Sequence, residues 1–360
     1  MLVSKLSHDL RVLWLIDVVS GGGGAVLSHL ICSLENVKHA VMTTCVNCEN
    51  SSHSMLAEIS SRATVLDGPS AEVQFAELPA FLDSFKPNIV VSHWWYGSSV
   101  ELAASIVRAH SPDVPHILVV HSVGSPPSRF DSYVMVSEVS KAFLFSEAPS
   151  PSSPVEVIHN GIDVDLFKPT KFERRMTFVT GTVGSLGSNK LPQYYCEAIS
   201  GIQLARHQHD LVGDGGHLLS MRDAIQKVGM GNRIRLLGEL QFQSPEIISF
   251  YRSLDAYLFL PTYPEPFPIA VLEAMAAGTP VIALARGGVC EQVHHGVTGF
   301  LCASIEEVQE RCVQLANNNE LAIGMRQAAV KRASAFSRQA MATRYGRLFE
   351  RLHRRGRKPA

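Results

Sequence analysis

The stretch YPEPFPIAVLEAMAAGTPVIA, residues 263–283, holds two acidic residues, Glu265 and Glu273, eight positions apart around an otherwise apolar run. A helix here would place one acid near its N-terminus, where the helix dipole favours negative charge, and the other on a solvated face. Alternatively, both acids face a ligand. Three prolines among the first six residues stiffen the approach, which suits a loop that holds Glu265 in place and begins a helix at once.

On either side of this stretch, short β-branched apolar runs alternate with amphipathic segments of helical spacing. The repeated order of strand, helix and strand predicts parallel sheets with right-handed crossovers. We therefore predict an α/β fold with two doubly wound, Rossmann-like domains that face each other across a cleft. The predicted strands are RVLWLIDVV, HAVMTTC, PNIVVSHWW and PHILVVHSV in the first half, and TFVTGTVGS, HDLVGDGG, NRIRLLGEL, DAYLFLPT and TPVIAL in the second.

The length of the chain also favours two domains, since it has 360 residues, of which 46% are hydrophobic and 18% charged. The segment SEAPSPSSPVEVIHNGIDVDLFKPTKFERR, residues 146–175, begins with Pro and Ser and ends in charged residues, which is the composition of a linker. We place the first domain over residues 1–168 and the second over residues 169–335.

Charge and cysteine content limit the partners and the compartment. The 32 Lys and Arg nearly balance the 33 Asp and Glu, so there is no electrostatic case for nucleic acid. Seven scattered cysteines fit a reducing compartment better than a disulfide framework.

Cys45 and Cys48 have metal or redox spacing, but no second pair completes a zinc site, and we expect no metal. Without a membrane-length apolar run or a signal peptide, the protein is expected to be soluble and cytoplasmic.

The C-terminal stretch RYGRLFERLHRRGRKPA is locally basic, with seven Lys and Arg from Arg344 to Lys358 against the single acid Glu350. Such a stretch could touch an anionic membrane surface or a phosphorylated substrate. The alternative is a solvated, frayed terminus.

Ligands of open parallel sheets bind at the carboxyl ends of the strands, so the loops there carry the candidate site. Gly21 to Gly24 follow the first strand and let the backbone approach a ligand closely, although a plain flexible turn would look the same. His93 and His121 each end a predicted strand; either can be a packed residue, but two that converge on one crevice favour function. Lys190 follows a run of small residues and could neutralise phosphate, although the spacing is not that of the P-loop.

At the acid pair, the free amides at the start of the helix could meet a diphosphate. Glu273, about two turns into the helix, would reach the same ligand from further back. Both carboxylates can accept hydrogen bonds from sugar or ribose hydroxyls.

The segments VIHNGIDVDLFKP, LVGDGG, EPFPIAVLEAMAAGTPVIA and GGVCEQVHHGVTGFL together resemble the signature segments of glycosyltransferase family 4, the retaining GT-B glycosyltransferases that use nucleotide-sugar donors. They occur in the order of that family, and the resemblance covers essentially the whole chain. The most specific element is the E-x7-E pattern, followed by NGID at residues 160–163. The resemblance implies an acceptor-binding first domain, a second domain that binds the nucleotide sugar, and a final helix, residues 336–353, that packs back on the first.

The resemblance also implies roles for single positions around the donor. The position of Glu265 contacts the donor sugar, and that of Glu273 holds the ribose. Lys190 matches a lysine that stabilises the departing diphosphate, and the backbone amides of Ile269 and Ala270 bind that group.

Further positions follow from the same resemblance. The position of His121 lies beside the donor sugar at the reacting face. Gly22 and Gly23 match the loop that closes over the diphosphate and the acceptor. Glu291, in GGVCE, matches a third recurrent acid without a clear role.

Acceptor contacts are expected on the irregular loops of the first domain, including HWWYGSS. His93 and Trp94 are the acceptor candidates, and the neighbouring aromatic residues Trp95 and Tyr96 could stack on a sugar or an aglycone. Packing is an equally good explanation for aromatic residues at the end of a strand.

One departure concerns the phosphate site, because Ser185 stands where the family usually has an arginine. A hydroxyl does not replace the charge and the bidentate hydrogen bonding of a guanidinium. The change predicts weaker diphosphate binding, a different donor, compensation by another cation such as Arg286, or loss of activity.

The expected reaction transfers a hexose-type sugar from an NDP-sugar to an acceptor hydroxyl with retention. No Asp-x-Asp pair stands in a suitable loop to hold a divalent metal, so charge on the leaving diphosphate must meet Lys190 and helix-terminal amides. The diphosphate oxygen itself takes the acceptor proton, and no other cofactor is needed. The alternatives are a GT-B sugar-nucleotide epimerase, a glycogen-phosphorylase-like enzyme, and a nucleotide-sugar-binding protein with little or no transferase activity.

Overall fold

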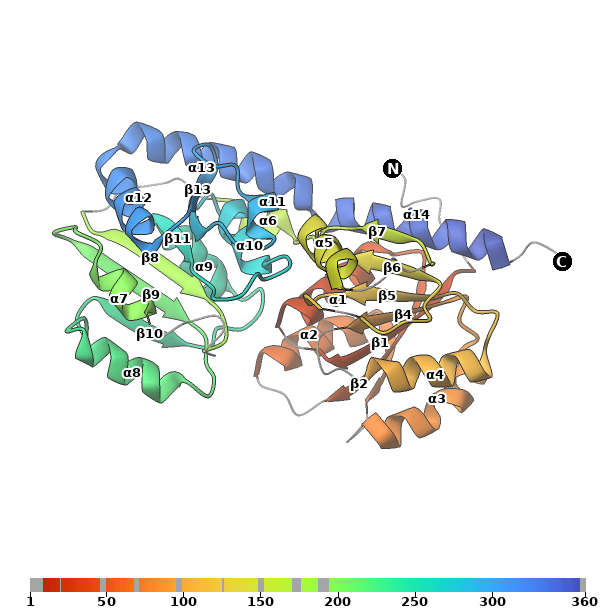
Figure 1. Cartoon of the computed structure of the whole chain (residues 1–360). Helices are drawn as coiled ribbons and strands as arrows, with labels where there is room; N and C mark the ends of the chain where they lie inside the picture. The colour runs from red at the N-terminus through yellow and green to blue at the C-terminus, as the bar shows by residue number, and fades with distance from the viewer. Residues whose placement is uncertain are drawn as a thin grey trace. The chain divides into compact units, whose positions relative to one another are not determined.

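The computed structural model describes residues 9–19, 21–45, 50–67, 71–94, 99–124, 126–147, 152–169, 176–186 and 194–356. The chain forms two compact units, Met1–Ile162 with Arg338–Ala360, and Asp163–Ser337 (Figure 1). At the point where the chain leaves the first unit and returns to it, Arg338 N donates a hydrogen bond to Ile162 O at 2.7 Å. Each unit is an α/β structure built on one parallel sheet.

The first unit contains a seven-stranded parallel sheet of order β3-β2-β1-β4-β5-β6-β7. Its elements, in chain order, are β1 (Arg11–Val18), α1 (Gly21–Ser33), β2 (Lys38–Cys45), α2 (Asn50–Ser60), β3 (Ala63–Asp67), α3 (Ala71–Phe85), β4 (Ile89–Trp94), α4 (Val100–His110), β5 (His116–Val120), β6 (Ser132–Met135), α5 (Glu138–Glu147), β7 (Val155–Val157) and α14 (Arg338–Gly356).

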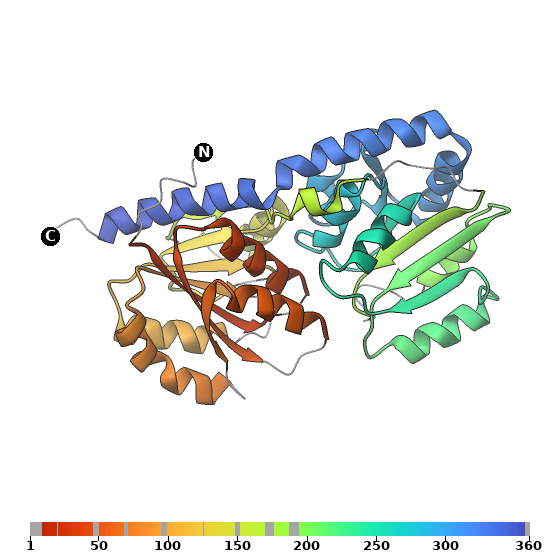
Figure 2. The same cartoon turned by 180° about the vertical axis from the view of Figure 1, so that it is seen from behind.

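Helices cover both faces of this sheet because its central strands are apolar on both sides. Leu13 and Leu15 of β1 pack with residues of α3 and α4, such as Leu78. On the opposite face, the Trp14 ring meets the Phe349 ring of α14 edge-on at a centroid distance of 5.9 Å. Figure 2 shows α14 lying along this side of the first unit. The last helix is therefore part of the core of the first unit.

The second unit contains a six-stranded parallel sheet of order β10-β9-β8-β11-β12-β13. Its elements are α6 (Val164–Phe167), β8 (Phe178–Val183), α7 (Tyr195–Ser200), β9 (His207–Val212), α8 (Leu218–Lys227), β10 (Ile234–Gly238), α9 (Pro245–Ser253), β11 (Ala256–Phe259), α10 (Ile269–Ala276), β12 (Val281–Leu284), α11 (Val289–Gln292), β13 (Gly299–Cys302), α12 (Ile305–Asn317), α13 (Asn319–Ala333) and a 3₁₀ turn (Ser334–Phe336).

One face of the second sheet is covered by α7, α8 and α12, which bury Tyr195, Ile225 and Cys312 against strand residues such as Leu258. The apolar helix α10 packs on the other face against β11, β12 and the helices α6, α9 and α13. All six residues from Val271 to Ala276 are buried. This burial explains why the helix around Glu273 is otherwise apolar.

The prediction of two parallel doubly wound sheets is confirmed, and all nine predicted strands are present. The sequence prediction missed β3, β6, β7 and β13. These strands are three to five residues long.

Candidate active site

In each sheet, successive strands are added first on one side of the starting strand and then on the other. The loops after the two strands at this switch point begin side by side at the carboxyl edge of the sheet, where ligands bind in such folds. In the second unit this point lies between β8 and β11. The loop after β8 contains Ser185, and the loop after β11 contains Glu265. In the first unit it lies between β1 and β4. The glycines of α1 follow β1, and His93 is the second-last residue of β4.

The Glu265 loop is held in place by the segment that follows β12. Gly288 N donates to Glu265 O at 2.8 Å. Gly287 has φ +78°, and a Cβ at Gly288 would lie only 1.8 Å from Pro266 O, so this close approach requires glycine. At the other end of the loop, Gln292 donates from Nε2 to Pro268 O at 3.0 Å. The loop is thus fixed from outside as well as stiffened by its prolines.

Glu273 lies in α10 with only 9% of its surface exposed. Its Oε2 accepts a hydrogen bond from the hydroxyl of Tyr251, in α9, at 2.6 Å. Burial raises the pKa of Glu273 to about 7, although this hydrogen bond acts in the opposite direction. Tyr251 is itself fully buried against Phe167 and Tyr257. The carboxylate of Glu273 is therefore almost fully buried and is hydrogen-bonded to a buried tyrosine.

Two tyrosines connect the acids to the strand ends. Burial raises the pKa of Tyr257, in β11, and the nearby charges of Glu265 and Glu273 raise it further. The Tyr257 hydroxyl donates to Val183 O at 3.2 Å, at the end of β8. Burial also raises the pKa of Tyr263, which shares a hydrogen bond with the Glu265 side chain. Both acids thus lie around the same part of the sheet edge.

The N-terminus of α10 lies directly after the acid loop. Its N-cap residue is Pro268, which makes no side-chain capping bond. Ile269, Ala270 and Glu273 share one face of the helix because they are three or four positions apart, and the first two are half-buried. The first-turn amides of a helix point along its axis towards the N-terminus, where they can bind an anion. The geometry is compatible with the diphosphate role that the resemblance implies.

The loop after β8 packs tightly on the glycine loop after β9. Leu186 N donates to Asp214 O at 2.9 Å, and Gly184 N donates to Val212 O at 3.0 Å. A Cβ at Gly213, whose φ is +142°, would lie 1.9 Å from Gly184 O. Ser185 is exposed on this loop. Lys190 lies outside the described residues.

The cation suggested as compensation for Ser185 is held at the same edge. Arg286 follows β12, and its Nη1 donates to Thr262 O at 2.7 Å. Glu291, in α11, is half-buried, and its backbone carbonyl accepts a hydrogen bond from Arg332 at 2.6 Å. Arg286 thus lies against the acid loop, whereas Arg332 fixes the backbone at Glu291.

In the first unit, α1 begins at Gly21, so the four glycines form its first turn rather than a loop before it. Gly22 is exposed and Gly23 is half-buried. Nearby, the carboxylate of Asp17 at the end of β1 accepts hydrogen bonds from Ser99 N, at 3.0 Å, and from the Ser99 hydroxyl. Asp17 therefore fixes the start of α4, a contact that the sequence did not indicate.

The two strand-end histidines do converge. His93 Nδ1 and His121 Nε2 are 2.8 Å apart, and the two rings stack at 12° with centroids 5.0 Å apart. Burial lowers the pKa of His121 to about 4 and that of His93 well below its ordinary value. Both rings are therefore neutral at physiological pH.

Trp94 is largely a core residue. It is 6% exposed and packs with Leu118, Val120 and Phe130. His93 has no exposed surface. Trp95, Tyr96 and Cys48, which the sequence also singled out, lie outside the described residues.

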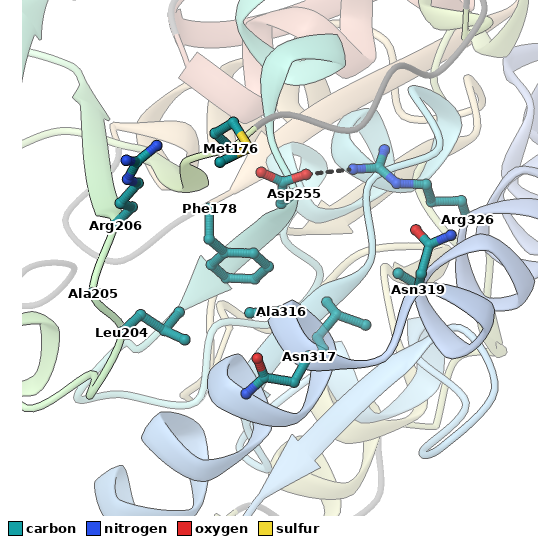
Figure 3. Close-up of a pocket in the computed structure, with 12 residues that line it drawn as sticks. Met176, Phe178, Leu204, Ala205, Arg206, Asp255, Ala316, Asn317, Asn319 and Arg326 are labelled. Atoms are coloured by element: carbon teal, nitrogen blue, oxygen red, sulfur yellow. Dashed lines mark hydrogen bonds and ion pairs between the residues drawn. The ribbon is translucent and has the colours of Figure 1, made fainter.

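A separate cavity of about 300 Å³ lies at the opposite edge of the second sheet (Figure 3). Its lining includes Phe178, Arg206 and Asp255, which stand at the amino ends of β8, β9 and β11. An ion pair of 3.5 Å between Asp255 and Arg326 forms part of its wall. The cavity contains none of the residues that the sequence assigned to donor binding.

Among the described residues, no group of three or more His, Cys, Asp and Glu is placed to hold a metal ion. Among the described helices, none combines the length and apolar character that a membrane span requires.

Two protein-family models match the chain and identify its family. A model described as Glycosyltransferase Family 4 matches residues 20–166, and one described as Glycosyl transferases group 1 matches residues 164–332. The chain belongs to glycosyltransferase family 4. The two matches adjoin near the point where the chain enters its second unit.

Similar proteins include the D-inositol 3-phosphate glycosyltransferase of Corynebacterium jeikeium, which is 32% identical over 233 residues, covering 57% of this chain and 55% of the relative. An enzyme of the same name from Thermobispora bispora is 25% identical over 353 residues, covering 81% of each chain. An uncharacterized glycosyltransferase of Methanocaldococcus jannaschii is 32% identical over 181 residues, with 46% of this chain and 45% of the relative covered. The chain spans about half the length of several of these curated relatives.

Solved structures have the same architecture. HepE of Anabaena in complex with UDP-glucose superposes with a TM-score of 0.79 at 19% identity, covering 95% of this chain and 100% of HepE. The sucrose-phosphate synthase of Thermosynechococcus elongatus gives 0.78 at 18% identity, covering 96% and 100%. These likenesses establish the GT-B fold.

Proposed function

We propose that the chain transfers a hexose-type sugar from an NDP-sugar to an acceptor hydroxyl with retention of configuration. The observation that carries the proposal is the acid pair at the edge of the second sheet. Glu265 lies on a loop fixed by Gly288 and Gln292, and Glu273 lies in the helix that follows, whose first-turn amides have no side-chain cap. Acceptor-only carboxylates beside an anion-binding helix start match a hydroxyl-rich diphosphate ligand.

The residues divide the proposed work between binding and leaving-group stabilisation. Glu265 accepts hydrogen bonds from the donor sugar, and Glu273 accepts them from the ribose. The amides of Ile269 and Ala270, together with Lys190, stabilise charge that develops on the diphosphate. The acceptor hydroxyl attacks the anomeric carbon of the sugar on the same face from which the diphosphate leaves. As the bond between sugar and diphosphate breaks, a diphosphate oxygen takes the proton of that hydroxyl. This scheme uses no metal and no dedicated protein base.

The comparisons suggest which substrates to test first. HepE structures contain UDP and UDP-glucose, and several relatives are named D-inositol 3-phosphate glycosyltransferases. We propose UDP-sugars as the first donors, and a phosphorylated polyol as one acceptor beside glycan and lipid-linked hydroxyls.

The test is incubation of the full chain with UDP-, GDP-, ADP- and dTDP-sugars and a panel of acceptors, with release of the nucleoside diphosphate and the product anomer measured. Glu265→Ala should reduce transfer by about a hundredfold or more, because it removes a sugar contact, while its melting temperature stays unchanged. Glu310→Ala, which removes an exposed carboxylate of α12, is the matched control. Full activity in Glu265→Ala would defeat the site assignment.

A second candidate function is nucleotide-sugar binding without transfer, and Ser185 is the observation that favours it. The family usually has arginine at this position, and Ser185 is exposed on its loop. Binding of a nucleoside diphosphate with no release from any donor would support this alternative. Conversion of the nucleotide sugar to an epimer without an acceptor would instead support an epimerase.

The basic C-terminal helix supports a proposed contact with an anionic membrane surface. Arg344, Arg347, Arg351 and Arg354 are all exposed, and their spacing places them on one face of α14. Arg351 pairs with Glu156, and Arg354 lies 3.8 Å from Glu350. Neither Arg344 nor Arg347 has an ion-pair partner among the described residues. A row of arginines attracts anionic headgroups.

Sedimentation with vesicles tests this contact. The chain should bind vesicles that contain phosphatidylglycerol and not pure phosphatidylcholine vesicles, and binding should weaken with salt. The double variant Arg344→Glu, Arg347→Glu should lose this binding. The same charge change at the exposed residues Arg222 and Lys331 of the second unit should leave it intact. Equal binding to both kinds of vesicle would contradict the proposal.

A further inference from the structure

We infer that His93 is a positioning residue: it donates its Nδ1 proton to His121 Nε2 and so fixes neutral His121 as the tautomer with Nδ1 protonated. The role of His121 beside a donor sugar rests on the proposed function. The tautomer itself does not, since it follows from contacts within the first unit.

The two rings are held together by the sheet rather than by flexible loops. In the parallel pairing of β4 with β5, His93 lies opposite Val119 and Trp94 opposite Val120. One residue further on, His121 N donates to Trp94 O at 2.9 Å. The stacked rings, with the nitrogens 2.8 Å apart, therefore follow from the strand register.

One proton must lie between the two facing nitrogens, because a hydrogen bond of 2.8 Å needs one donor and one acceptor. If His121 donated, neutral His93 would carry its proton on Nε2. That atom is buried, and it has no hydrogen-bond partner among the described residues. A buried N–H without an acceptor loses its hydrogen bonds to water without replacement and is rare in proteins.

If His93 donates instead, its Nε2 carries only a lone pair. His93 lies against the Trp14 ring, with centroids 5.9 Å apart, and has no exposed surface. Incomplete satisfaction of an acceptor is more common in protein interiors than that of an N–H donor. The arrangement with His93 as donor is therefore the more stable one.

Two consequences follow for His121. Its Nε2 lone pair is already used by His93, so this nitrogen does not serve as a base. Its other nitrogen carries a proton, so the ring acts as a hydrogen-bond donor. Burial keeps the pKa of His121 at about 4, and the ring therefore stays neutral through the physiological range. A neutral donor suits an oxygen of a sugar, which the proposed function places beside this residue.

The first experiment reads the tautomer without any substrate. The full chain is labelled with ¹⁵N-histidine, and the ring nitrogens of His121 are observed by long-range ¹H–¹⁵N NMR at pH 7, with the assignment made from a His121→Gln spectrum. We expect an unprotonated Nε2 and a protonated Nδ1. The reverse pattern, or an imidazolium, would overturn the inference whether or not the chain transfers sugar.

The second experiment uses two substitutions of His93. His93→Phe keeps a ring of similar size in the stack and removes the N–H, and we expect the His121 tautomers to mix. His93→Asn places an amide close to the former Nδ1 and should restore the single tautomer. Melting temperatures show whether each variant is folded. An unchanged His121 spectrum in His93→Phe would contradict the inference.

Activity then separates a positioning role from a packing role. In His93→Phe, kcat/KM should fall about tenfold, the effect of one misplaced hydrogen bond, and His93→Asn should recover most of it. Equal activity losses in both variants, with the tautomer restored only by Asn, would show that His93 does not act through the tautomer of His121. Absence of transfer by the unmodified chain would count against the proposed function and leave the NMR result standing.

Discussion

Replacing Glu273 by Gln should stabilise the second unit in a pH-dependent way. The carboxyl is almost fully buried, and its pKa is raised from the ordinary 4.5 to about 7. A raised pKa means that the charged form is disfavoured in the folded state, so stability falls as pH rises from 4.5 to 7 and is level above that. At about 1.36 kcal/mol for each pKa unit, the cost of the charge is about 3 kcal/mol at about pH 8.

The glutamine of the Glu273→Gln variant would resemble the protonated acid, since its carbonyl oxygen can still accept the hydrogen bond from Tyr251. The variant should therefore exceed the natural chain by about 3 kcal/mol in free energy of unfolding at about pH 8, and by little near pH 4.5. Subtracting the stability change at one pH from that at the other cancels the part of the change in free energy of unfolding that does not depend on charge.

Urea unfolding at both pH values provides the measurement. All three tryptophans lie in the first unit, so their fluorescence follows that unit alone. Far-UV circular dichroism follows both units, and the part of its change that tryptophan fluorescence does not share reports the second unit. Glu310→Gln, at an exposed site of α12, is the control. It should change the free energy of unfolding by the same amount at both pH values. If the advantage of Glu273→Gln were the same at the two pH values, the argument that burial raises this pKa would be refuted.

Two further predictions concern the loops at this edge. Gly288→Ala should displace the acid loop, because the added Cβ would lie 1.8 Å from Pro266 O; we expect a lower melting temperature and a loss of kcat/KM, whereas Gly231→Ala, where no atom lies within 4 Å, should change neither. Ser185→Arg should tighten binding of nucleoside diphosphate about tenfold by restoring a bidentate cation, measured by titration calorimetry. Unchanged affinity in the arginine variant would show that another cation already compensates.

The strands that the sequence predicted are those with a strong local signal. RVLWLIDVV and PHILVVHSV are runs of β-branched and apolar residues, as expected of strands buried on both faces. By contrast, β6 has four residues, and β7 (VEV) lies within a Pro- and Ser-rich segment that looks like a linker. These short strands form because a neighbouring strand offers backbone partners, and that information is not local.

The candidate site was predictable where its residues share one stretch of sequence. The sequence indicated a stiff loop that carries Glu265 and a helix that carries Glu273, and α10 begins at Ile269, between the two acids. The partner of Glu273 was not predictable, because Tyr251 lies 22 positions away in another helix. The glycine pair in GGVCE was visible, but its role as a clamp on Glu265 appears only when β12 is placed beside β11.

The pairing of the strand-end histidines illustrates the same limit. Their positions at the ends of two strands predicted convergence, and the register of β4 with β5 produces it. Which nitrogen of each ring faces the other depends on side-chain rotation. The rotation of each ring is decided by packing around Trp14 and by the depth of burial. Neither can be predicted from the spacing of residues in the sequence.

The unfavourable burial of Glu273 makes physical sense if a ligand completes its hydrogen bonds. In the structure one hydroxyl, that of Tyr251, donates to Oε2, and the pKa stays at about 7. Two ribose hydroxyls that donate to the carboxylate would favour its ionised form and lower this pKa. Nucleotide binding at neutral pH should then release protons, and affinity should rise as pH increases through the pKa of about 7 and level off above it.

Calorimetric titration with UDP in buffers of different ionisation enthalpy measures this proton release directly. The phosphate of UDP also titrates near neutral pH, so the quantity that matters is the difference from Glu273→Gln, which keeps the ligand and removes the carboxyl. The natural chain should release more protons than the variant, by up to about one half per site when the pKa equals the pH. Equal release by both proteins would mean that the carboxylate is already ionised before the nucleotide arrives, or that the ribose does not reach it.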